Sequence, residues 1–235
     1  MINSEIVITV DDRYKRHSNR PSTQPQVTSF EQLGLKEEVL KGIYSCGFEK
    51  PSAIQQSAIP VMISNPQSHL IAQTRFGSGR TASYAIAMLE RVETSKTHVQ
   101  ALVLVPTREL AYNIGSFVEN LGHYVKMKLY KVIGGISLQS DIQVLQQGGV
   151  HILVGTPGRV LHHIHTGYLD LSNLKMVVLD EADSILSYGF KEMIIDILKS
   201  IPKDVQFSMF SATMPNEVLE IADMFMDEYP IRIFL

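Results

Sequence analysis

Residues 176–179 (Met-Val-Val-Leu) form an uninterrupted apolar run that is followed directly by Asp180-Glu181-Ala182-Asp183. Such a run is typical of a strand buried on both faces of a parallel sheet. Ligands bind such sheets outside the carboxyl ends of the strands. There, one carboxylate can hold Mg²⁺ through water, and a second can orient or deprotonate an attacking water. Taken alone, the pattern fits an acidic surface turn better, and a candidate phosphate loop upstream changes that balance.

Other apolar segments predict strands that alternate with helices along the chain. Alternation of this kind predicts an α/β fold with a mostly parallel sheet and helices on both faces. Each predicted strand ends in small, polar or glycine residues, so the carboxyl edge of the sheet should form a continuous polar rim. The remaining predicted strands are 69–73, 101–105, 129–133, 151–154, 206–210 and 231–235.

The segment Thr74-Arg75-Phe76-Gly77-Ser78-Gly79-Arg80-Thr81 follows a predicted strand and precedes a predicted helix. Strand, glycine loop and helix together are the context of a phosphate-binding loop. Gly77 and Gly79 allow backbone N–H groups to turn inward around phosphate oxygens, and the start of the helix adds a favourable dipole. Thr81 is placed to bind Mg²⁺. A plain glycine turn before a helix competes with this interpretation.

Three residues depart from the usual phosphate-loop pattern. Thr74 stands where the pattern begins with glycine, and Phe76 places a large ring among small residues. Arg80 stands where lysine is required, and its wider, forked guanidinium keeps the charge but changes its position. These departures leave open a degenerate loop that does not support ATP turnover.

The region before this loop predicts two helices. Apolar spacing over 30–46 suits an amphipathic helix, and Ser52 is placed to cap a second helix that runs to about Ile63. Phe48 offers a stacking face, and the Gln55 amide has both a donor and an acceptor for the edge of a base. From the residues alone, a core Phe48 and a solvated Gln55 are favoured.

Composition limits the environment and the partners of the chain. Its 45% hydrophobic and 19% charged residues are those of an ordinary globular domain. No apolar run reaches membrane-spanning length, and the N-terminus lacks a signal-peptide pattern. Cys46 is the only cysteine, so an internal disulfide and a zinc cluster are excluded. We therefore expect an intracellular protein, cytoplasmic or nuclear, without a membrane partner.

Charge also limits how nucleic acid could bind. The net charge is −3 and the isoelectric point is about 6.2, whereas binding by bulk electrostatics usually requires a basic protein. Contacts must therefore be local. The predicted strand ends supply donors for phosphates at Thr107, Arg108, Thr156 and Arg159.

Two further segments are interpreted conservatively. Residues 1–28 are rich in polar residues and proline and predict a flexible tail. His162, His163 and His165 do not share one helix face, so surface or partly buried histidines are favoured over a metal site.

The motifs at 47–55, 74–81, 106–110, 134–135, 156–159, 180–183 and 211–213 occur in an order that resembles the N-terminal RecA-like domain of DEAD-box RNA helicases. The resemblance covers residues 29–235 and implies a P-loop NTPase fold. Within that family the chain is most similar to the translation-initiation RNA helicase group.

The resemblance implies an ATP site with Mg²⁺. Phe48 would stack on adenine and Gln55 would read its edge, with Lys50 nearby. Glu181 would position the attacking water, with Asp180 and Arg80 as the other catalytic residues, and Thr81 and Asp180 would hold Mg²⁺, the latter through water. Phosphates would contact Thr74, Gly77, Ser78, Gly79, Arg80 and Thr81. Asp183 and Ser211 would couple the nucleotide state to the RNA state through hydrogen bonds, with Thr213 nearby, and all three would belong to the nucleotide site.

The resemblance also implies an RNA-backbone path and protein partners. The path would be lined by Pro106, Thr107, Arg108, Gly134, Gly135, Thr156, Pro157 and Arg159. Such helicases work with a second RecA-like domain that carries arginine fingers, whose loss costs about 10³–10⁵ in rate. We therefore expect this chain, which lacks that domain, to be nearly inactive alone, and regulatory protein partners are possible. The alternatives are a degenerate RNA- or protein-binding module and, less favoured, a small-molecule kinase.

Overall fold

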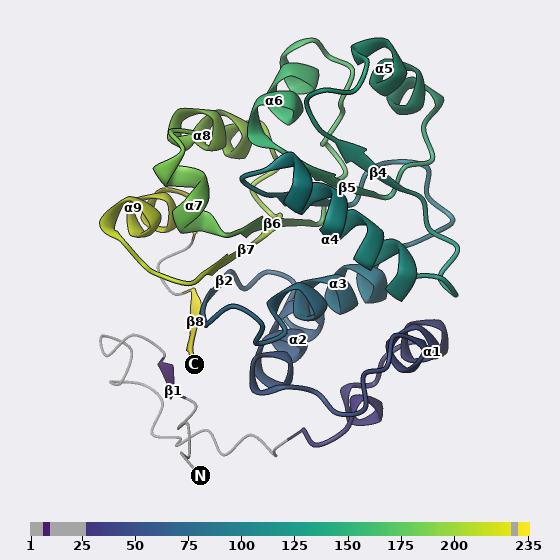
Figure 1. The fold of residues 1–235 in the computed structure, drawn as a ribbon, viewed down its shortest axis with the longest axis vertical. Coiled ribbons are helices and arrows are strands. Elements are labelled where there is room, and N and C mark those ends of the chain that lie inside the picture. The colour runs from purple at the N-terminus through teal and green to yellow at the C-terminus, as the bar shows by residue number, and fades with distance from the viewer. Residues whose placement is uncertain (1–6, 10–26, 227–229) are drawn as a thin grey trace.

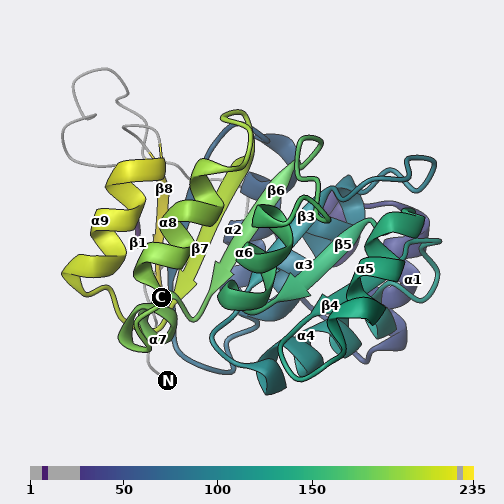
Figure 2. The same ribbon diagram turned by 90° about the horizontal axis from the view of Figure 1, so that it is seen from above.

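A computed structural model describes residues 7–9, 27–226 and 230–235 of the chain. Within these residues, an eight-stranded sheet has the order β1-β8-β2-β7-β6-β3-β5-β4 (Figures 1 and 2). The acidic motif ends β6, which lies between β7 and β3. The strands are β1 (Val7–Thr9), β2 (Leu70–Gln73), β3 (Ala101–Leu104), β4 (Leu129–Val132), β5 (Ile152–Gly155), β6 (Met176–Asp180), β7 (Gln206–Ser211) and β8 (Ile231–Phe234).

The sheet is parallel from β8 to β4, as the sequence predicts. The exception is β1, which pairs antiparallel with β8 through Val7 and Phe234. The strand β1 falls inside the segment 1–28 that is predicted to form a flexible tail. Residues 1–6 and 10–26 of the predicted tail lie outside the described residues.

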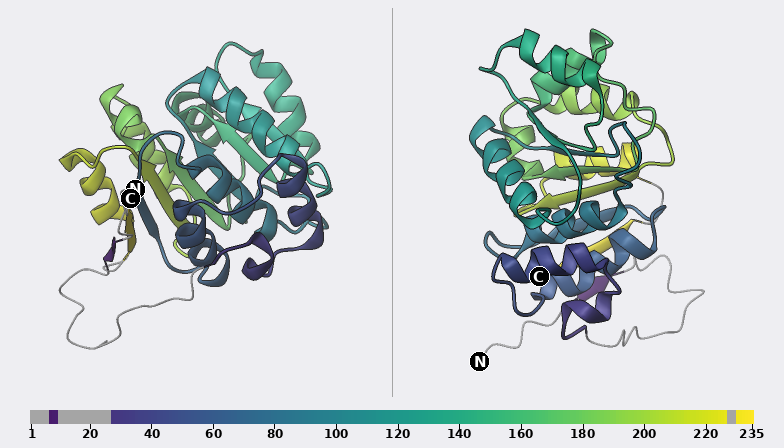
Figure 3. Two further views of the ribbon diagram at one scale, coloured as in Figure 1. Left: turned by 60° about the horizontal axis from the view of Figure 1, so that its bottom comes forward. Right: turned by 90° about the vertical axis from the view of Figure 1, so that its right-hand side faces the viewer.

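Helices cover both faces of the sheet, which confirms the predicted α/β fold (Figures 2 and 3). One face carries α1 (Glu37–Ser45), α2 (Ala53–Ser64), α3 (Arg80–Arg91) and α4 (Arg108–Leu121). The other face carries α5 (Leu138–Gln147), α6 (Pro157–His165), α7 (Ala182–Ser187), α8 (Lys191–Lys199) and α9 (Asn216–Phe225).

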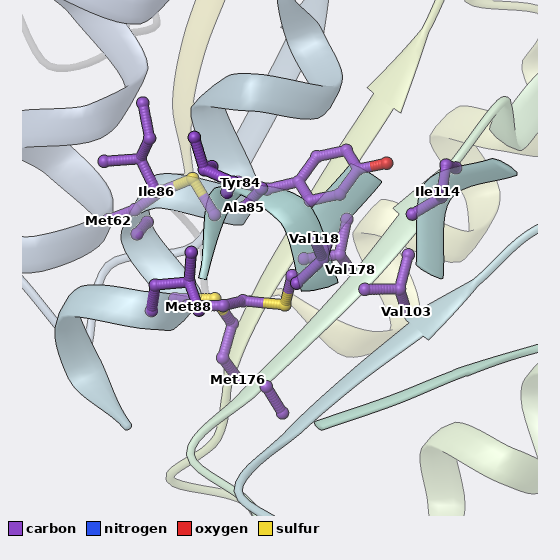
Figure 4. Close-up of a cluster of buried hydrophobic side chains, with 14 of the residues drawn as sticks. Met62, Tyr84, Ala85, Ile86, Met88, Val103, Ile114, Val118, Met176 and Val178 are labelled. Carbon is purple, nitrogen blue, oxygen red and sulfur yellow. The ribbon is translucent and has the colours of Figure 1, made fainter. Parts of the chain in front are cut away.

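The strand β6 contributes to the core on both faces of the sheet. Its five residues are all buried. Met176 and Val178 pack into the cluster under α1–α4, whereas Val177 and Leu179 pack into the cluster under α6–α9. In Figure 4 the ring of Tyr84, from α3, lies in the first cluster near Val178. Burial of alternate side chains on opposite faces explains why the run is apolar throughout.

The single helix predicted over 30–46 is wrong, because the chain forms two shorter helices there. A 3-10 helix spans Phe30–Leu33, and α1 begins only at Glu37. Gly34 between them has a φ of 66°, in the left-handed region that ends helices. The apolar spacing continues across the break because both pieces pack on the same core.

Gly42 gives a direct test of how α1 packs. A Cβ added there would lie 1.8 Å from the carbonyl oxygen of Leu121, at the end of α4. Backbone cannot yield as a flexible side chain does, so Gly42→Ala should lower the free energy of unfolding by about 3 kcal/mol. The matched control is Gly158→Ala in α6, where the nearest atom is 3.8 Å away and the expected change is below about 1 kcal/mol. Urea denaturation followed by circular dichroism measures both, and equal effects would contradict this packing.

Candidate nucleotide site and adjoining groove

The glycine loop and the acidic motif meet at the carboxyl edge of the sheet. Strands β2, β7 and β6 are neighbours, with Gln73 paired to Ser211 and Asp180 paired to Phe210. Beyond the last pair, the backbone N–H of Thr74 donates to the carbonyl of Ser211 at 3.1 Å. The start of the loop is therefore fixed beside the end of β7.

Asp180 is a nearly buried carboxylate at this edge, with only 3% of its surface exposed. Its Oδ2 accepts a hydrogen bond from the Tyr84 hydroxyl at 2.9 Å, and its Oδ1 accepts one from the backbone N–H of Glu181 at 2.9 Å. Burial raises the pKa of Asp180, and the Arg80 charge opposes that rise. Loop and acidic strand thus interact electrostatically across the site.

Glu181 follows in an unusual backbone conformation. Its φ of 52° makes it the single non-glycine residue with positive φ in the described parts of the chain. Such strain persists where the surroundings fix the backbone, and it often occurs at functional sites. Burial and the neighbouring Asp180 both raise the pKa of Glu181. The side chain is half-buried at the start of α7.

Asp183 joins the end of β6 to the end of β7. Its Oδ2 accepts hydrogen bonds from the backbone N–H of Thr213 at 3.0 Å and from the Thr213 hydroxyl at 2.7 Å. Its own N–H donates to Ser211 Oγ at 3.2 Å. Burial alone would raise the pKa of Asp183, but the hydrogen bonds from Thr213 and Ser211 lower it below its usual value. Three predicted site residues are thus in direct contact.

The glycine loop packs against the start of α2. Gly79 has a φ of 103°, and a Cβ there would lie 2.6 Å from Gln55 Nε2 and 2.8 Å from Ser52 Oγ. Ser52 Oγ donates to the carbonyl of Ser78 at 2.8 Å. Only glycine suits this position, because it adopts the positive φ angle readily and has no Cβ to clash with Gln55 and Ser52.

Gln55 is buried, so the solvated position favoured from the residues alone is wrong. Its exposed fraction is 2%. The Gln55 Oε1 accepts from the backbone N–H of Ser52 at 2.8 Å, and its Nε2 lies 3.4 Å from the carbonyl of Gly79. A helix-capping interaction turns the amide inward toward the loop. The predicted start of α2 at Ser52 is confirmed.

Phe48 and Lys50 lie at the entrance to this region. Phe48 is half-buried, and its ring meets that of Phe117 edge-on with centroids 6.2 Å apart. Lys50 is exposed. The contact with Phe117 supports the ring while part of it remains accessible, and stacking on adenine stays a prediction.

Arg80 occupies the first position of α3 and is 7% exposed. Its guanidinium carbon lies 4.7 Å from the ring centroid of Phe76, which is itself 63% exposed. Arg80 Nη1 has no hydrogen-bond partner among the described residues. Thr81, the predicted Mg²⁺ ligand, follows in the same turn and is half-buried. Two of the three departures, Arg80 and Phe76, therefore place a buried cation under an aromatic ring, with one donor that has no partner among the described residues.

A groove of about 590 Å³ lies on the other half of the sheet edge, after β3, β4 and β5. A Cβ at Gly134 would lie 2.8 Å from Arg108 Nη2, and one at Gly135 would lie 2.8 Å from Arg108 Nη1. The glycine pair therefore allows the guanidinium to approach the backbone closely. Of the predicted RNA-binding residues, the groove is lined by Pro106, Thr107, Arg108, Gly134, Thr156 and Arg159. The other two predicted residues, Gly135 and Pro157, each follow a lining residue in the chain. The lining residues that were not predicted are Leu138, Gly158, His162 and Phe190.

The histidine cluster differs from its prediction in one residue. His163 is fully buried and hydrogen-bonds to Asp141, rather than lying at or near the surface. Among the described residues, no group of three or more histidine, cysteine or acidic side chains is arranged to hold a metal. None of the described helices is both long and apolar enough to cross a bilayer.

Comparison with known proteins gives consistent matches. The family described as DEAD/DEAH box helicase matches residues 52–221. Eukaryotic initiation factor 4A of Caenorhabditis elegans is 47% identical over 209 residues, which are 89% of this chain and 51% of that protein. The chain thus spans about half the length of this relative.

Solved structures agree with the sequence comparison. Dbp5 of S. cerevisiae bound to RNA and ADP BeF3 has a TM-score of 0.78 and 36% identity, over 85% of this chain and 50% of that one. A Dbp5 variant bound to Gle1 and IP6 has a TM-score of 0.83 and 34% identity, over 89% and 53% of the two chains.

The raised pKa of Asp180 predicts a pH-dependent gain in stability for Asp180→Asn. In the unfolded chain the Asp180 carboxyl ionises at its ordinary pKa, whereas in the folded chain its pKa is raised. Between these two pKa values, ionisation favours the unfolded state, so the free energy of unfolding of the wild type falls as the pH rises. Above the folded pKa the loss is complete. Asp180→Asn should therefore raise the free energy of unfolding at neutral pH by on the order of 1 kcal/mol. The advantage should shrink as the pH falls toward the ordinary carboxyl value.

Urea denaturation at neutral and acidic pH measures this difference. Asp196→Asn, on the exposed side of α8, controls for the loss of one negative charge. The control should change the free energy of unfolding by less than about 0.5 kcal/mol. If Asp180→Asn instead lowered the free energy of unfolding at neutral pH, the ionised Asp180 carboxylate would not be destabilising the folded state.

Proposed function

The chain belongs to the DEAD/DEAH box helicase family, and we propose that it is the ATP-binding, N-terminal RecA-like half of an RNA helicase. In this proposal the complete protein couples ATP binding and hydrolysis to RNA-backbone binding and duplex unwinding. The observation that carries it is the division of one sheet edge: loop, acidic motif and Ser211–Thr213 follow β2, β6 and β7, and the groove follows β3, β4 and β5.

The nucleotide half has the chemistry that a triphosphate requires. Arg80 Nη1 is a buried donor with no hydrogen-bond partner in the described part of the chain, which suits a phosphate oxygen. The positive φ angles of Gly77 and Gly79 turn the loop backbone at the start of α3, where N–H groups favour anions. Phe48 and Gln55 at the side of the loop are proposed to contact adenine.

Mg²⁺ fits the same edge. Asp180 and Thr81 offer carboxylate and hydroxyl oxygens, the ligand class that this ion prefers, and we assign them to hold it, Asp180 through water. When bound, the ion neutralises charge on the transferred phosphoryl group. The hydrogen bonds from Tyr84 and from the N–H of Glu181 fix the Asp180 carboxylate in one orientation.

Glu181 is proposed to orient the attacking water. Its pKa is raised by burial and by Asp180, and a base works best when its pKa lies closer to the working pH. The backbone at Glu181 is held in the left-handed region, which restricts where the carboxylate can lie. Asp183 connects this turn to Thr213 through hydrogen bonds, so a movement at the end of β6 would be transmitted to the end of β7, and the reverse.

The groove half is proposed to bind the RNA backbone rather than its bases. Its donors are Thr107, Arg108, Thr156 and Arg159, all suited to phosphate oxygens, and its glycines allow a backbone to approach closely. Because the net charge is −3, binding must depend on these local donors.

Partners are proposed on the same basis. A second RecA-like domain would complete the site, and the Dbp5 structures bound to RNA and to Gle1 support RNA and a regulatory protein as partners. Residues 29–235 would form the ATP-binding domain, and the protein would act in the cytoplasm or the nucleus.

One observation favours a second candidate function, a module that does not hydrolyse ATP. Arg80 lies buried under Phe76, so the aromatic ring stands between the guanidinium and solvent, from which a phosphate would have to approach. Titration with a fluorescent ATP analogue separates the two functions. Failure of the wild type to bind, together with binding by Arg80→Lys, would favour the degenerate module.

The proposed ATP site predicts that Arg80→Ala weakens binding of the analogue by about tenfold or more, because a charged hydrogen bond to phosphate is lost. Arg75→Ala is the matched control, since Arg75 is exposed in the same loop. It should change affinity by no more than about twofold. Equal losses in the two variants would indicate a general electrostatic effect rather than a specific phosphate contact.

The chain alone is predicted to hydrolyse ATP negligibly, with or without RNA. In this family the second domain supplies arginine fingers, and their absence lowers phosphoryl transfer by about 10³–10⁵. Phosphate release is measured with and without oligouridine, and Glu181→Gln provides the baseline. RNA-stimulated turnover above that baseline would contradict the prediction.

A further inference from the structure

A buried polar cluster lies directly beneath the groove and has no part in the nucleotide site. It consists of Tyr130 on β4, Asp141 on α5, and Arg159 and His163 on α6. The side chains of Asp141 and His163 have no exposed surface, and that of Arg159 is 11% exposed. The cluster therefore joins the three elements that form the outer wall of the groove.

Asp141 is the centre of this cluster. Its Oδ1 accepts a hydrogen bond from the Tyr130 hydroxyl at 2.8 Å, and its Oδ2 accepts one from His163 Nε2 at 2.9 Å. Arg159 Nη1 lies 3.3 Å from the same Oδ2. On its other side, Arg159 Nη2 donates to the carbonyl of Ile136, in the loop that follows Gly134 and Gly135.

Each oxygen of Asp141 is thus occupied by a neutral donor or by the imidazole. Burial raises the pKa of Tyr130 to about 12, with the hydrogen bond to Asp141 adding to the rise, so the phenol remains a donor. A guanidinium and a carboxylate otherwise prefer a two-pronged contact with two short, parallel hydrogen bonds. Here Arg159 instead approaches a single oxygen, the Oδ2 that His163 also contacts, at 3.3 Å through Nη1. That nitrogen is buried and makes no hydrogen bond of good geometry among the described residues.

We propose that His163 is a positioning residue for the groove: by occupying the Asp141 carboxylate, it prevents a two-pronged Asp141–Arg159 pair and keeps the Arg159 guanidinium available to an RNA phosphate. This inference rests on the proposed RNA-binding function. The ligand it concerns is a phosphodiester of a single-stranded RNA backbone. His163 itself does not line the groove.

A packing role alone does not account for this histidine. His163 lies on the buried face of α6, where an apolar side chain would add no buried polar atom of its own. The imidazole instead leaves Nδ1 without a hydrogen-bond partner in the described part of the chain. Buried polar groups are costly unless they are fully bonded, so this arrangement is retained against a cost in stability.

The test compares RNA binding by variants of the 235-residue chain, measured as fluorescence anisotropy of labelled oligouridine over a series of salt concentrations. Arg159→Gln should weaken binding about tenfold and lower the salt slope by roughly 0.7, the value for one phosphate contact on a single strand. His163→Leu should weaken binding about threefold. His163→Gln, whose amide can donate in place of Nε2, should stay within about twofold of the wild type.

The double variant His163→Leu with Arg159→Gln decides whether His163 acts through Arg159. If it does, the double variant binds RNA no more weakly than Arg159→Gln alone, because the losses are not additive. Affinity for the fluorescent ATP analogue should be unchanged by His163→Leu. Circular dichroism checks that each variant is folded. If His163→Leu does not fold, Tyr130→Phe replaces it, because it removes the hydrogen bond to the other Asp141 oxygen. The same weaker RNA binding and the same non-additive loss with Arg159→Gln are expected.

Three results would overturn the inference. These are wild-type RNA affinity in His163→Leu, additive losses in the double variant, and a lower melting temperature without any change in RNA affinity or salt slope. A wild-type chain that binds ATP but no oligouridine at low salt would overturn the proposed function as well. The failure of the inference alone is therefore distinguishable from the failure of both.

Discussion

The buried carboxylate of Asp180 is the constraint on which the rest of the site depends. A charged group at the end of a central strand destabilises the fold unless hydrogen bonds and an opposite charge surround it. Tyr84 and Arg80 supply these, and both belong to α3, which begins at the phosphate loop. The helix that stabilises the acid is therefore also the helix that positions the loop, and neither can shift without the other.

The strand order extends this constraint across the whole edge. Because β7 lies between β2 and β6, the Ser211–Thr213 segment contacts both the loop and the acidic motif, through the carbonyl of Ser211 and the carboxylate of Asp183. Because β3 is the other neighbour of β6, the groove begins directly beside the acidic strand. The proposed nucleotide and RNA halves of the edge are therefore direct neighbours, with no strand between β6 and β3.

Two buried cationic side chains show how local chemistry modifies the common fold. Arg80 replaces a lysine and lies under the ring of Phe76, so that its larger guanidinium is held by an aromatic neighbour within the same loop. Arg159 is held between Asp141 and the backbone of Ile136, with His163 limiting how closely the carboxylate can pair with it. In both, the position of a proposed phosphate donor is set by a neighbour that is not itself proposed to contact phosphate.

The sequence by itself determined the parallel sheet and the glycine loop between a strand and a helix, because apolar runs, strand ends and glycines act over a few neighbouring residues. It did not show that Gln55 is buried, that Gly34 divides a helix, or that His163 reaches Asp141. The first depends on the glycine loop and the third on a residue 22 positions away in sequence. Only the tertiary structure decided these contacts, because they arise when distant elements pack together and leave a polar group one available partner.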